Sequence, residues 1–214
     1  MSVDQALETI LSAIQPLPGE EVPITEGLDR VLAEDVVSPV DVPPFVNSAM
    51  DGYAVRAADV TGARRSAPVT LPVVGEVPAG CASEQVLRPG SALRIMTGAP
   101  LPAGADAVVP FEQTDQGRAQ VAVYKPVSAG DHVRLAGEDI RQGQRVLEAG
   151  HVLRPADIGV LAAIGRPAVR VVRRPRVAIL ATGDELVDVT ECVGPGQIRN
   201  SNEYTSIAVV KRYG

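Results

Sequence analysis

The sequence predicts a multi-domain α+β protein: a helical and extended stem with an inserted small β-barrel-like module, followed by the start of a parallel α/β domain. Three observations predict this class. The 20 glycines and 18 prolines among 214 residues punctuate the chain every few positions, which favours several small modules over one large core. Short β-like runs fill the middle of the chain, and helical periodicity lies on both sides of them.

The first predicted element is a helix over residues 2–14. Ser2 followed by Gln5 is the signature of a capping box at its start, and Pro16 ends it. A second short helix is predicted around residues 27–35. The apolar residues of the first helix recur at helical spacing: Val3, Ala6, Leu7, Ile10, Leu11 and Ile14. We expect residues 1–18 to pack as a helix on the α/β domain.

The β module is predicted over residues 46–132, because turn residues separate five short β-like runs there. Such a density of short strands is typical of a small barrel or sandwich. The runs cover residues 53–55, 69–74, 93–96, 107–111 and 121–124. The stem is predicted over residues 19–45 and 133–172. Its helix at 155–164 has Pro155 at the first helical position and Gly165 at the position after the end.

The last part, residues 173–214, is predicted to begin a parallel α/β domain. The apolar run 177–181 is expected to be a strand, and residues 201–212 a helix, as in a first β-loop-α unit. A parallel strand needs neighbouring strands to pair its backbone groups. We therefore expect the chain to be truncated inside this domain and the segment from about residue 176 to fray in isolation.

Composition excludes several classes of function. The 26 acidic against 20 basic residues give a net charge of −6, which argues against nucleic acid as a partner. Two distant cysteines, Cys81 and Cys192, and only two histidines disfavour a disulfide scaffold and a zinc site. The N-terminus lacks a signal peptide and no apolar run reaches about 20 residues, so no membrane association and a cytoplasmic location are expected.

Four glycine-flanked loops carry oxygen-bearing side chains. The first contains Asp51, the second Thr97 and the third Asp139. Each has a plain alternative: Asp51 followed by Gly52 is typical of a tight turn, Thr97 of the end of a strand, and the paired acids 138–139 of a solvated turn. Local sequence leaves both interpretations open for these three loops.

The fourth loop combines residues 181–186 with 196–202. Loops at the carboxyl ends of parallel strands form the crevice where α/β folds bind ligands. The next helix begins near residues 200–202, whose types suit capping, and its free amides can hold a phosphate. The alternative is a capped helix without a ligand.

The acidic loop residues suit hard cations, especially Mg²⁺ held jointly with substrate phosphates. They are Asp51, Asp139, Asp184 and Glu185. The chain has no Ser-His-Asp order, Walker loop or GxGxxG fingerprint. The residue types therefore point to phosphate-ester or phosphoanhydride chemistry.

Five motifs together resemble the molybdopterin molybdenumtransferase family, the molybdenum insertases of molybdenum-cofactor biosynthesis, similar to the E domain of gephyrin. The motifs occur in the family's order and rough spacing over nearly the whole chain. They are PPFVNSAMDGYA at 43–54, RIMTGAPLP at 94–102, GEDI at 137–140, RPRVAILATGDEL at 174–186 and GQIRNSN at 196–202.

The resemblance implies a homodimer that inserts molybdate into adenylylated molybdopterin, with Mg²⁺, and releases AMP. It implies a molybdopterin-adenylating protein of the same pathway as a partner. Catalytic roles fall on Asp51, Thr97, Asp139 and Glu185, with Asp51 and Glu185 meeting one Mg²⁺-phosphate site across the dimer interface. Substrate-binding roles fall on Thr182, Gly183, Asp184, Ser201 and Asn202. A molybdate oxygen would serve as the nucleophile, which fits the lack of a catalytic Ser or Cys.

Two other classes of function stay open. Family members continue through further loops and a C-terminal β domain that are not present here, so the chain alone is expected not to insert molybdenum. It would then be a non-catalytic fragment or a scaffold and dimerisation module of the same family. The second alternative is an anion- or pterin-binding protein without chemistry.

Overall fold

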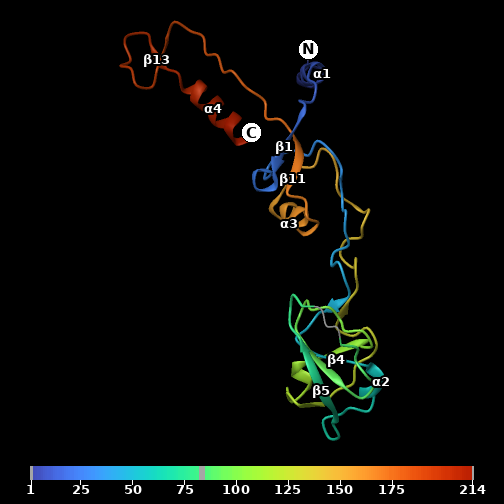
Figure 1. Ribbon diagram of the computed structural model, residues 1–214. Coiled ribbons are helices and arrows are strands. Elements are labelled where there is room, and N and C mark those ends of the chain that lie inside the picture. Colours follow the sequence, from blue (N-terminus) through green and yellow to red (C-terminus); the bar gives the residue numbers. More distant parts are fainter. Residues whose placement is uncertain (1, 82–84, 214) are drawn as a thin grey trace. The chain divides into compact units, whose positions relative to one another are not determined.

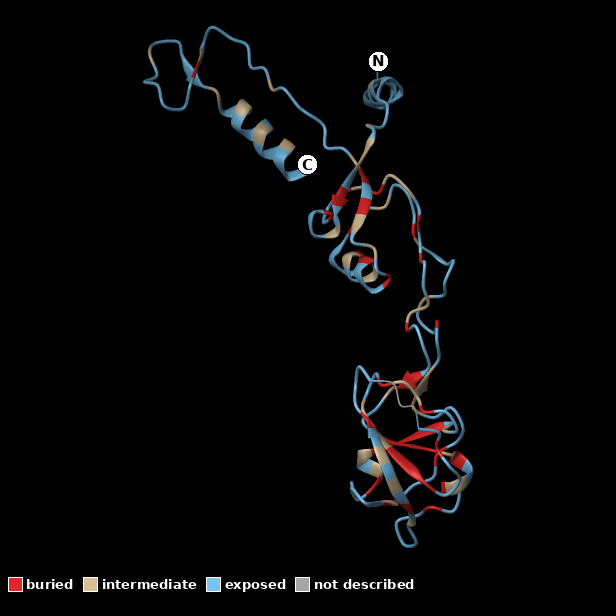
Figure 2. Ribbon diagram, in the orientation of Figure 1, coloured by how far each residue is buried: buried red, intermediate tan, exposed pale blue. Residues whose placement is uncertain are grey.

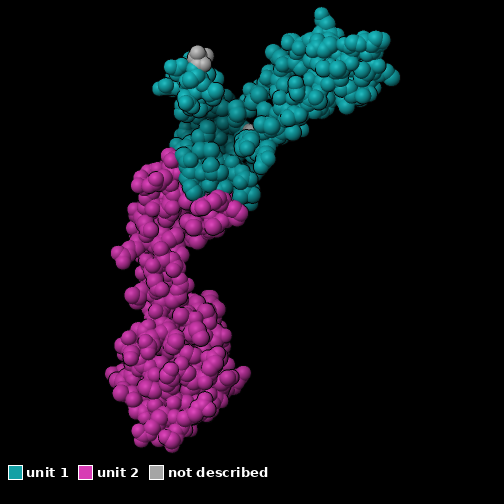
Figure 3. All heavy atoms as spheres, turned by 180° about the vertical axis from the view of Figure 1, so that it is seen from behind, with its two compact units in different colours: residues 1–34, 150–153, 168–214 teal, residues 35–149, 154–167 magenta. Residues whose placement is uncertain are grey.

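A computed structural model of the protein describes residues 2–81 and 85–213 (Figure 1). The chain divides into two compact units, shown in Figure 3. The terminal unit comprises residues 1–34, 150–153 and 168–214, and the central unit comprises residues 35–149 and 154–167. The finer division into four parts that the sequence suggests stays a prediction.

The central unit is built around a five-stranded mixed sheet with the strand order β7-β4-β6-β5-β8. Strands β5 and β6 are parallel, and the other neighbours are antiparallel. The strands are β4 (Gly52–Val55), β5 (Val69–Val77), β6 (Ala92–Ile95), β7 (Ala107–Pro110) and β8 (Gln120–Val123). All five predicted runs therefore form strands. The sheet is a half-barrel in which β7 and β8 are the edges.

Side chains bury both faces of this sheet. Tyr53 and Val55 of β4 pack in one hydrophobic cluster, whereas Ala54 packs in another with Leu93 and Val108. Every residue of β4 is buried, and the strands of this unit carry most of the buried colour in Figure 2. A strand covered on both faces has a continuous apolar sequence, which explains why β4 lacks an alternating pattern.

Short elements complete the central unit. The pairs β2 (Val36–Val37) with β10 (Arg145–Leu147), and β3 (Asn47–Ser48) with β9 (Val133–Arg134), are antiparallel. The helices are α2 (Ala57–Val60), the 3₁₀ turn η2 (Phe111–Gln113) and α3 (Pro155–Ala163). Helix α3 confirms the predicted stem helix. Asp157 caps its start, accepting from the Arg154 amide at 2.8 Å, and Gly165 follows its end with φ +74°.

In the terminal unit, α1 (Val3–Ala13) confirms the first predicted helix and its capping box. The Gln5 amide donates to Ser2 Oγ at 3.2 Å, and the Ser2 amide donates to Gln5 Oε1 at 2.9 Å. The large apolar side chains of α1 are exposed in the structure. That α1 packs on the α/β domain stays a prediction.

The helix predicted at residues 27–35 is wrong. A 3₁₀ turn, η1 (Ile24–Glu26), precedes this segment, and the ribbon of β1 (Gly19–Pro23) with β11 (Ala168–Val172) lies beside it. Leu32 bridges Val171, and its amide donates to the carbonyl of His151 at 2.9 Å. The segment therefore satisfies its backbone by long-range pairing, which overrides its helical propensity.

The run at residues 177–181, predicted to be a strand that needs neighbouring strands to pair it, forms no strand. In the described part of the chain this run carries no strand pairing, and Leu180 is 88% exposed. The parallel pair lies further on, as β12 (Leu186–Val187) and β13 (Ile198–Arg199), and is followed by the predicted helix, α4 (Ser201–Tyr213). An apolar run becomes a parallel strand only where neighbours pair it. Among the described helices, none has the length and apolar character needed to cross a bilayer.

Candidate functional site

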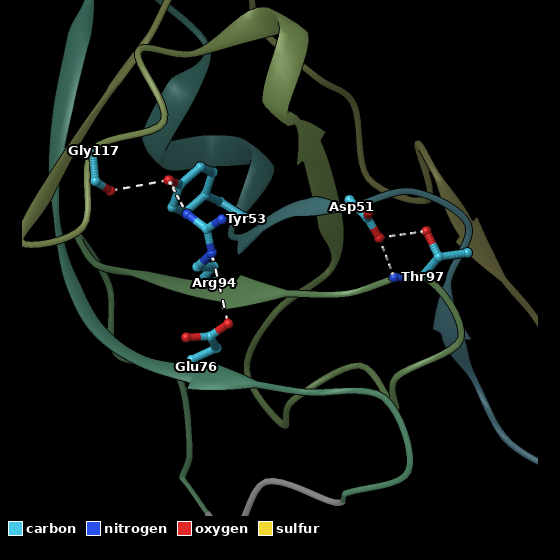
Figure 4. Close-up of polar contacts among 6 residues, drawn as sticks. All are labelled: Asp51, Tyr53, Glu76, Arg94, Thr97 and Gly117. Carbon is cyan, nitrogen blue, oxygen red and sulfur yellow. Dashed lines mark hydrogen bonds and ion pairs between the residues drawn. The ribbon is translucent and has the colours of Figure 1, made fainter.

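Asp51 and Thr97 form one polar contact at the end of the half-barrel sheet. Asp51 Oδ1 accepts two hydrogen bonds from Thr97, from the backbone amide at 2.8 Å and from the hydroxyl Oγ1 at 2.7 Å (Figure 4). Both residues are exposed. The structure therefore brings together two of the predicted site residues that lie far apart in sequence.

The register of β4 and β6 explains this meeting. Gly52 lies opposite Ile95 and Tyr53 opposite Arg94 in an antiparallel pair. Asp51 precedes the start of β4 and Thr97 follows the end of β6, so both lie at the same end of the pair. Thr97 and Gly98 form the turn that follows β6, and Gly98 has φ +80°.

Gly52 has a different role from the one its sequence context suggests. The tight-turn alternative for Asp51 and Gly52 is wrong, because Gly52 begins β4 and is not among the glycines with positive φ. A Cβ at this position would lie 2.1 Å from the carbonyl oxygen of Val109. Glycine is therefore required for the close approach of β4 to β7.

Hydrogen bonding lowers the pKa of the Asp51 carboxyl. The backbone hydrogen bond from Thr97 lowers the pKa of the Asp51 carboxyl most, and the hydroxyl of Thr97 lowers it further. Partial desolvation opposes these effects, and the positive charge of Arg94 adds a smaller lowering. Both hydrogen bonds use Oδ1, which leaves Oδ2 for another ligand.

Asp139 lies in the turn between β9 and β10 and forms an ion pair with Arg134. The turn is fixed by its backbone: the Asp139 amide donates to the Val42 carbonyl at 3.0 Å, and the Gly137 amide donates to the Pro43 carbonyl at 2.9 Å. Gly137 has φ +69°, a conformation that favours glycine. The acid is thus held by a specific cation rather than only by solvent.

The remaining predicted residues lie in the terminal unit. Glu185 folds back over Gly183, where a Cβ would meet both carboxylate oxygens at 2.6 Å. Thr182 and Asn202 line a cavity of about 250 Å³. Its other lining residues come from the same unit: Ile179, Leu180, Ala181, Leu186, Asn200, Glu203 and Ser206. Asp184 is exposed, and Ser201 begins α4.

The cap of α4 is reciprocal. The Glu203 amide donates to Asn200 Oδ1 at 3.2 Å, and Asn200 Nδ2 donates to Glu203 Oε2 at 2.6 Å. Asn200 is therefore the capping residue among the three suggested by the sequence. The carboxylate of Glu203 lies at the positive end of the helix and reduces the attraction of this end for a phosphate.

Asp51 and Glu185 belong to different compact units, so their joint metal site stays a prediction. Within residues 2–81 and 85–213, no group of three or more His, Cys, Asp or Glu side chains has the arrangement of a metal site. Sequence reasoning missed Arg94 and Arg134 as neighbours of the site. A cation between the apolar residues Leu93 and Ile95 was the available signal for Arg94.

A family model and two curated proteins are similar to the chain. The model of the MoeA N-terminal region (domain I and II) matches residues 1–165. Molybdopterin molybdenumtransferase 2 of Mycobacterium tuberculosis (strain ATCC 25618 / H37Rv) is 46% identical over 90% of the chain and 48% of its own length. Molybdopterin molybdenumtransferase of Staphylococcus aureus (strain N315) is 38% identical over 99% of the chain and 51% of its own length.

Solved structures agree with these relatives. The molybdopterin biosynthesis moeA protein of Pyrococcus horikoshii OT3 superposes with a TM-score of 0.89 at 37% identity, covering 98% of this chain and 56% of that one. The chain spans about half the length of the curated relatives it matches. The family model covers most of the residues of this chain. The chain therefore belongs to the MoeA family, and the part that it matches is the N-terminal region of that family.

Proposed function

We propose that the chain acts in molybdenum-cofactor biosynthesis as part of a molybdopterin molybdenumtransferase, which inserts molybdate into adenylylated molybdopterin and releases AMP. The observation that carries this proposal is the contact between Asp51 and Thr97, inside the region that matches the family model. An ionised carboxylate held by two hydrogen bonds is better suited to binding a phosphate-bound cation than to general acid–base catalysis.

Asp51 fits Mg²⁺ as one ligand of a shared site. Mg²⁺ usually takes one or two protein carboxylates and completes its shell with water and substrate phosphates, so one exposed carboxylate can serve as one of its ligands. When bound, Mg²⁺ would supply neutralisation of the negative phosphoanhydride. Asp51 would hold it together with Glu185 of the partner subunit in a homodimer.

Thr97 is a positioning residue in this proposal rather than a nucleophile. Its hydroxyl hydrogen is used in the hydrogen bond to Asp51 Oδ1. The lowered pKa makes Asp51 a poor base for activating that hydroxyl. The nucleophile would then be an oxygen of molybdate, which needs no deprotonation.

Other groups would bind the substrate. Thr182, Gly183, Asp184, Ser201 and Asn202 would line the pterin-phosphate side of the substrate site. Asp139, paired with Arg134, would orient that cation toward substrate oxygens, since arginine matches phosphate geometry. The molybdopterin-adenylating protein of the pathway would deliver the substrate in the cytoplasm.

The test is AMP release by the full-length protein supplied with adenylylated molybdopterin and Mg²⁺, with and without molybdate. The proposal predicts release of AMP and formation of the cofactor only when molybdate is present. Binding of the adenylylated pterin without release would instead support a binding protein. If the protein neither binds the adenylylated pterin nor releases AMP, the scaffold alternative remains and the enzymatic proposal is overturned.

A further inference from the structure

Arg94 occupies an unusual position beside the Asp51–Thr97 contact. It lies in the middle of β6, between the buried residues Leu93 and Ile95, and its side chain is only 16% exposed. Its guanidinium carbon stacks 4.3 Å above the ring of Phe111. Burying a cation is costly unless it is partnered, so its contacts have to offset this cost.

Those contacts join three neighbouring strands and a loop (Figure 4). Arg94 Nη1 donates to the hydroxyl of Tyr53 at 3.4 Å, and Arg94 Nε lies 3.7 Å from Glu76 Oε1. The hydroxyl of Tyr53 in turn donates to the carbonyl of Gly117 at 2.9 Å. Tyr53 is fully buried, and its ring meets Phe111 edge to face with 5.4 Å between centroids.

The same cluster touches the candidate site through its backbone. Tyr53 lies directly opposite Arg94 in the β4–β6 register. The amide of Phe111 donates to the carbonyl of Asp51 at 3.1 Å. Arg94 and its ring partners therefore hold β4, which follows Asp51, against β6, which precedes Thr97.

We propose that Arg94 is a positioning residue that fixes the β4–β6 register and so sets the contact between Asp51 and Thr97. The inference deepens the proposed function, on which its catalytic meaning rests. A slip of one residue in register would turn Arg94 and Tyr53 to opposite faces of the sheet and would separate the cation from its ring partners. Registers in which Asp51 does not contact Thr97 would therefore lose the contacts of Arg94 with its ring partners and would be less stable.

The test follows the contact itself in the chain of 214 residues. The variants are Arg94→Gln, Arg94→Lys and Tyr53→Phe, and the matched control is Arg118→Gln, because Arg118 lines the same cavity of about 370 Å³ as Arg94. The two readouts, both by NMR, are hydrogen exchange of the Thr97 amide and the pKa of the Asp51 carboxyl.

Arg94→Gln should speed exchange of the Thr97 amide by about tenfold or more, as expected for a weakened hydrogen bond, and should raise the pKa of Asp51. Arg94→Lys keeps the charge, so the pKa should rise less while exchange stays faster than in wild type. Tyr53→Phe, which changes no charge at neutral pH, should also speed exchange. Arg118→Gln should leave both readouts unchanged.

Wild-type exchange of the Thr97 amide in both Arg94→Gln and Tyr53→Phe would overturn the proposal, even if the pKa of Asp51 rose through loss of charge. Equal acceleration in Arg118→Gln would overturn it as well, because the effect would then be a general one of the cavity. These readouts need no substrate. A wild-type protein that shows the contact but releases no AMP would contradict only the proposed function.

Discussion

Substitution of Gly52 by alanine probes the step that brings the site together. The added Cβ would lie 2.1 Å from the carbonyl oxygen of Val109, 2.9 Å from its carbonyl carbon and 3.0 Å from Cα of Pro110. All three are backbone atoms of β7 or its immediate end, so no flexible side chain can yield. Strands β4 and β7 would have to separate by roughly 1 Å or more to restore ordinary contact.

The expected cost follows from this separation. Overpacking in a filled core costs about 1–3 kcal/mol, and each ladder hydrogen bond that is lost adds about 1 kcal/mol. We expect a loss of roughly 3 kcal/mol in the free energy of unfolding, a large share of the 5–15 kcal/mol of a whole domain. Exchange of the β4 amides should then accelerate by about two orders of magnitude.

Native-state hydrogen exchange over β4 measures this directly. Gly62→Ala is the matched control, because a Cβ there meets no heavy atom within 4 Å and its φ does not lie in the positive region. This substitution should be neutral or slightly stabilising, since alanine restricts the unfolded chain. Equal exchange rates in Gly52→Ala and Gly62→Ala would refute the requirement for close approach.

Three further predictions concern other parts of the chain. Thr97→Val removes the hydroxyl but keeps the backbone donor, so AMP release by the full-length protein should fall by roughly fivefold to tenfold, about 1 kcal/mol; an unchanged rate would exclude the positioning role. The pKa of Asp51 is lowered in the folded state, so its contribution to the free energy of unfolding should be complete above about pH 4 and lost as pH falls through the folded pKa. Comparing wild type with Asp51→Asn in urea across this range checks the sign, and a difference that grows toward acid would contradict it. Residues 177–181 should exchange their amides rapidly in a chain that ends at Gly214, because no strand pairs them; strong protection throughout the run would show that the pairing argument is wrong.

Much of the central unit could be predicted from the sequence because its signals are local. Glycines lie between each strand of the five and the next along the chain, and Pro155 with Gly165 marks both ends of α3. The failures have a common physical cause. The local pattern of residues 27–35 suggests a helix, but long-range pairing gives the segment another structure. The local pattern of residues 177–181 suggests a strand, but no strand pairs this run in the described chain.

The candidate site divides in the same way. The residue types of Asp51 and Thr97 indicated oxygen chemistry, but only the β4–β6 register shows that they meet through one carboxylate oxygen. Gly52 resembled a turn residue because glycine is selected for two different reasons. It is favoured where a turn needs a positive φ, and it is also needed where two strands approach closely, as β4 and β7 do here. Arg134 was missed because its ion pair with Asp139 depends on the fold of the intervening turn.

The measurement that tests the central claim most directly is AMP release from adenylylated molybdopterin, with Mg²⁺ and molybdate, by full-length wild type and its Asp51→Asn variant. Asp115→Asn is the matched control, because Asp115 is another exposed aspartate whose Oδ1 accepts two hydrogen bonds, from Gly117 at 3.1 Å and Ala122 at 2.9 Å. Loss of the charge at Asp51 should lower the rate about a hundredfold or more with the fold intact, and Asp115→Asn should keep the wild-type rate. A wild-type rate in Asp51→Asn would contradict the account.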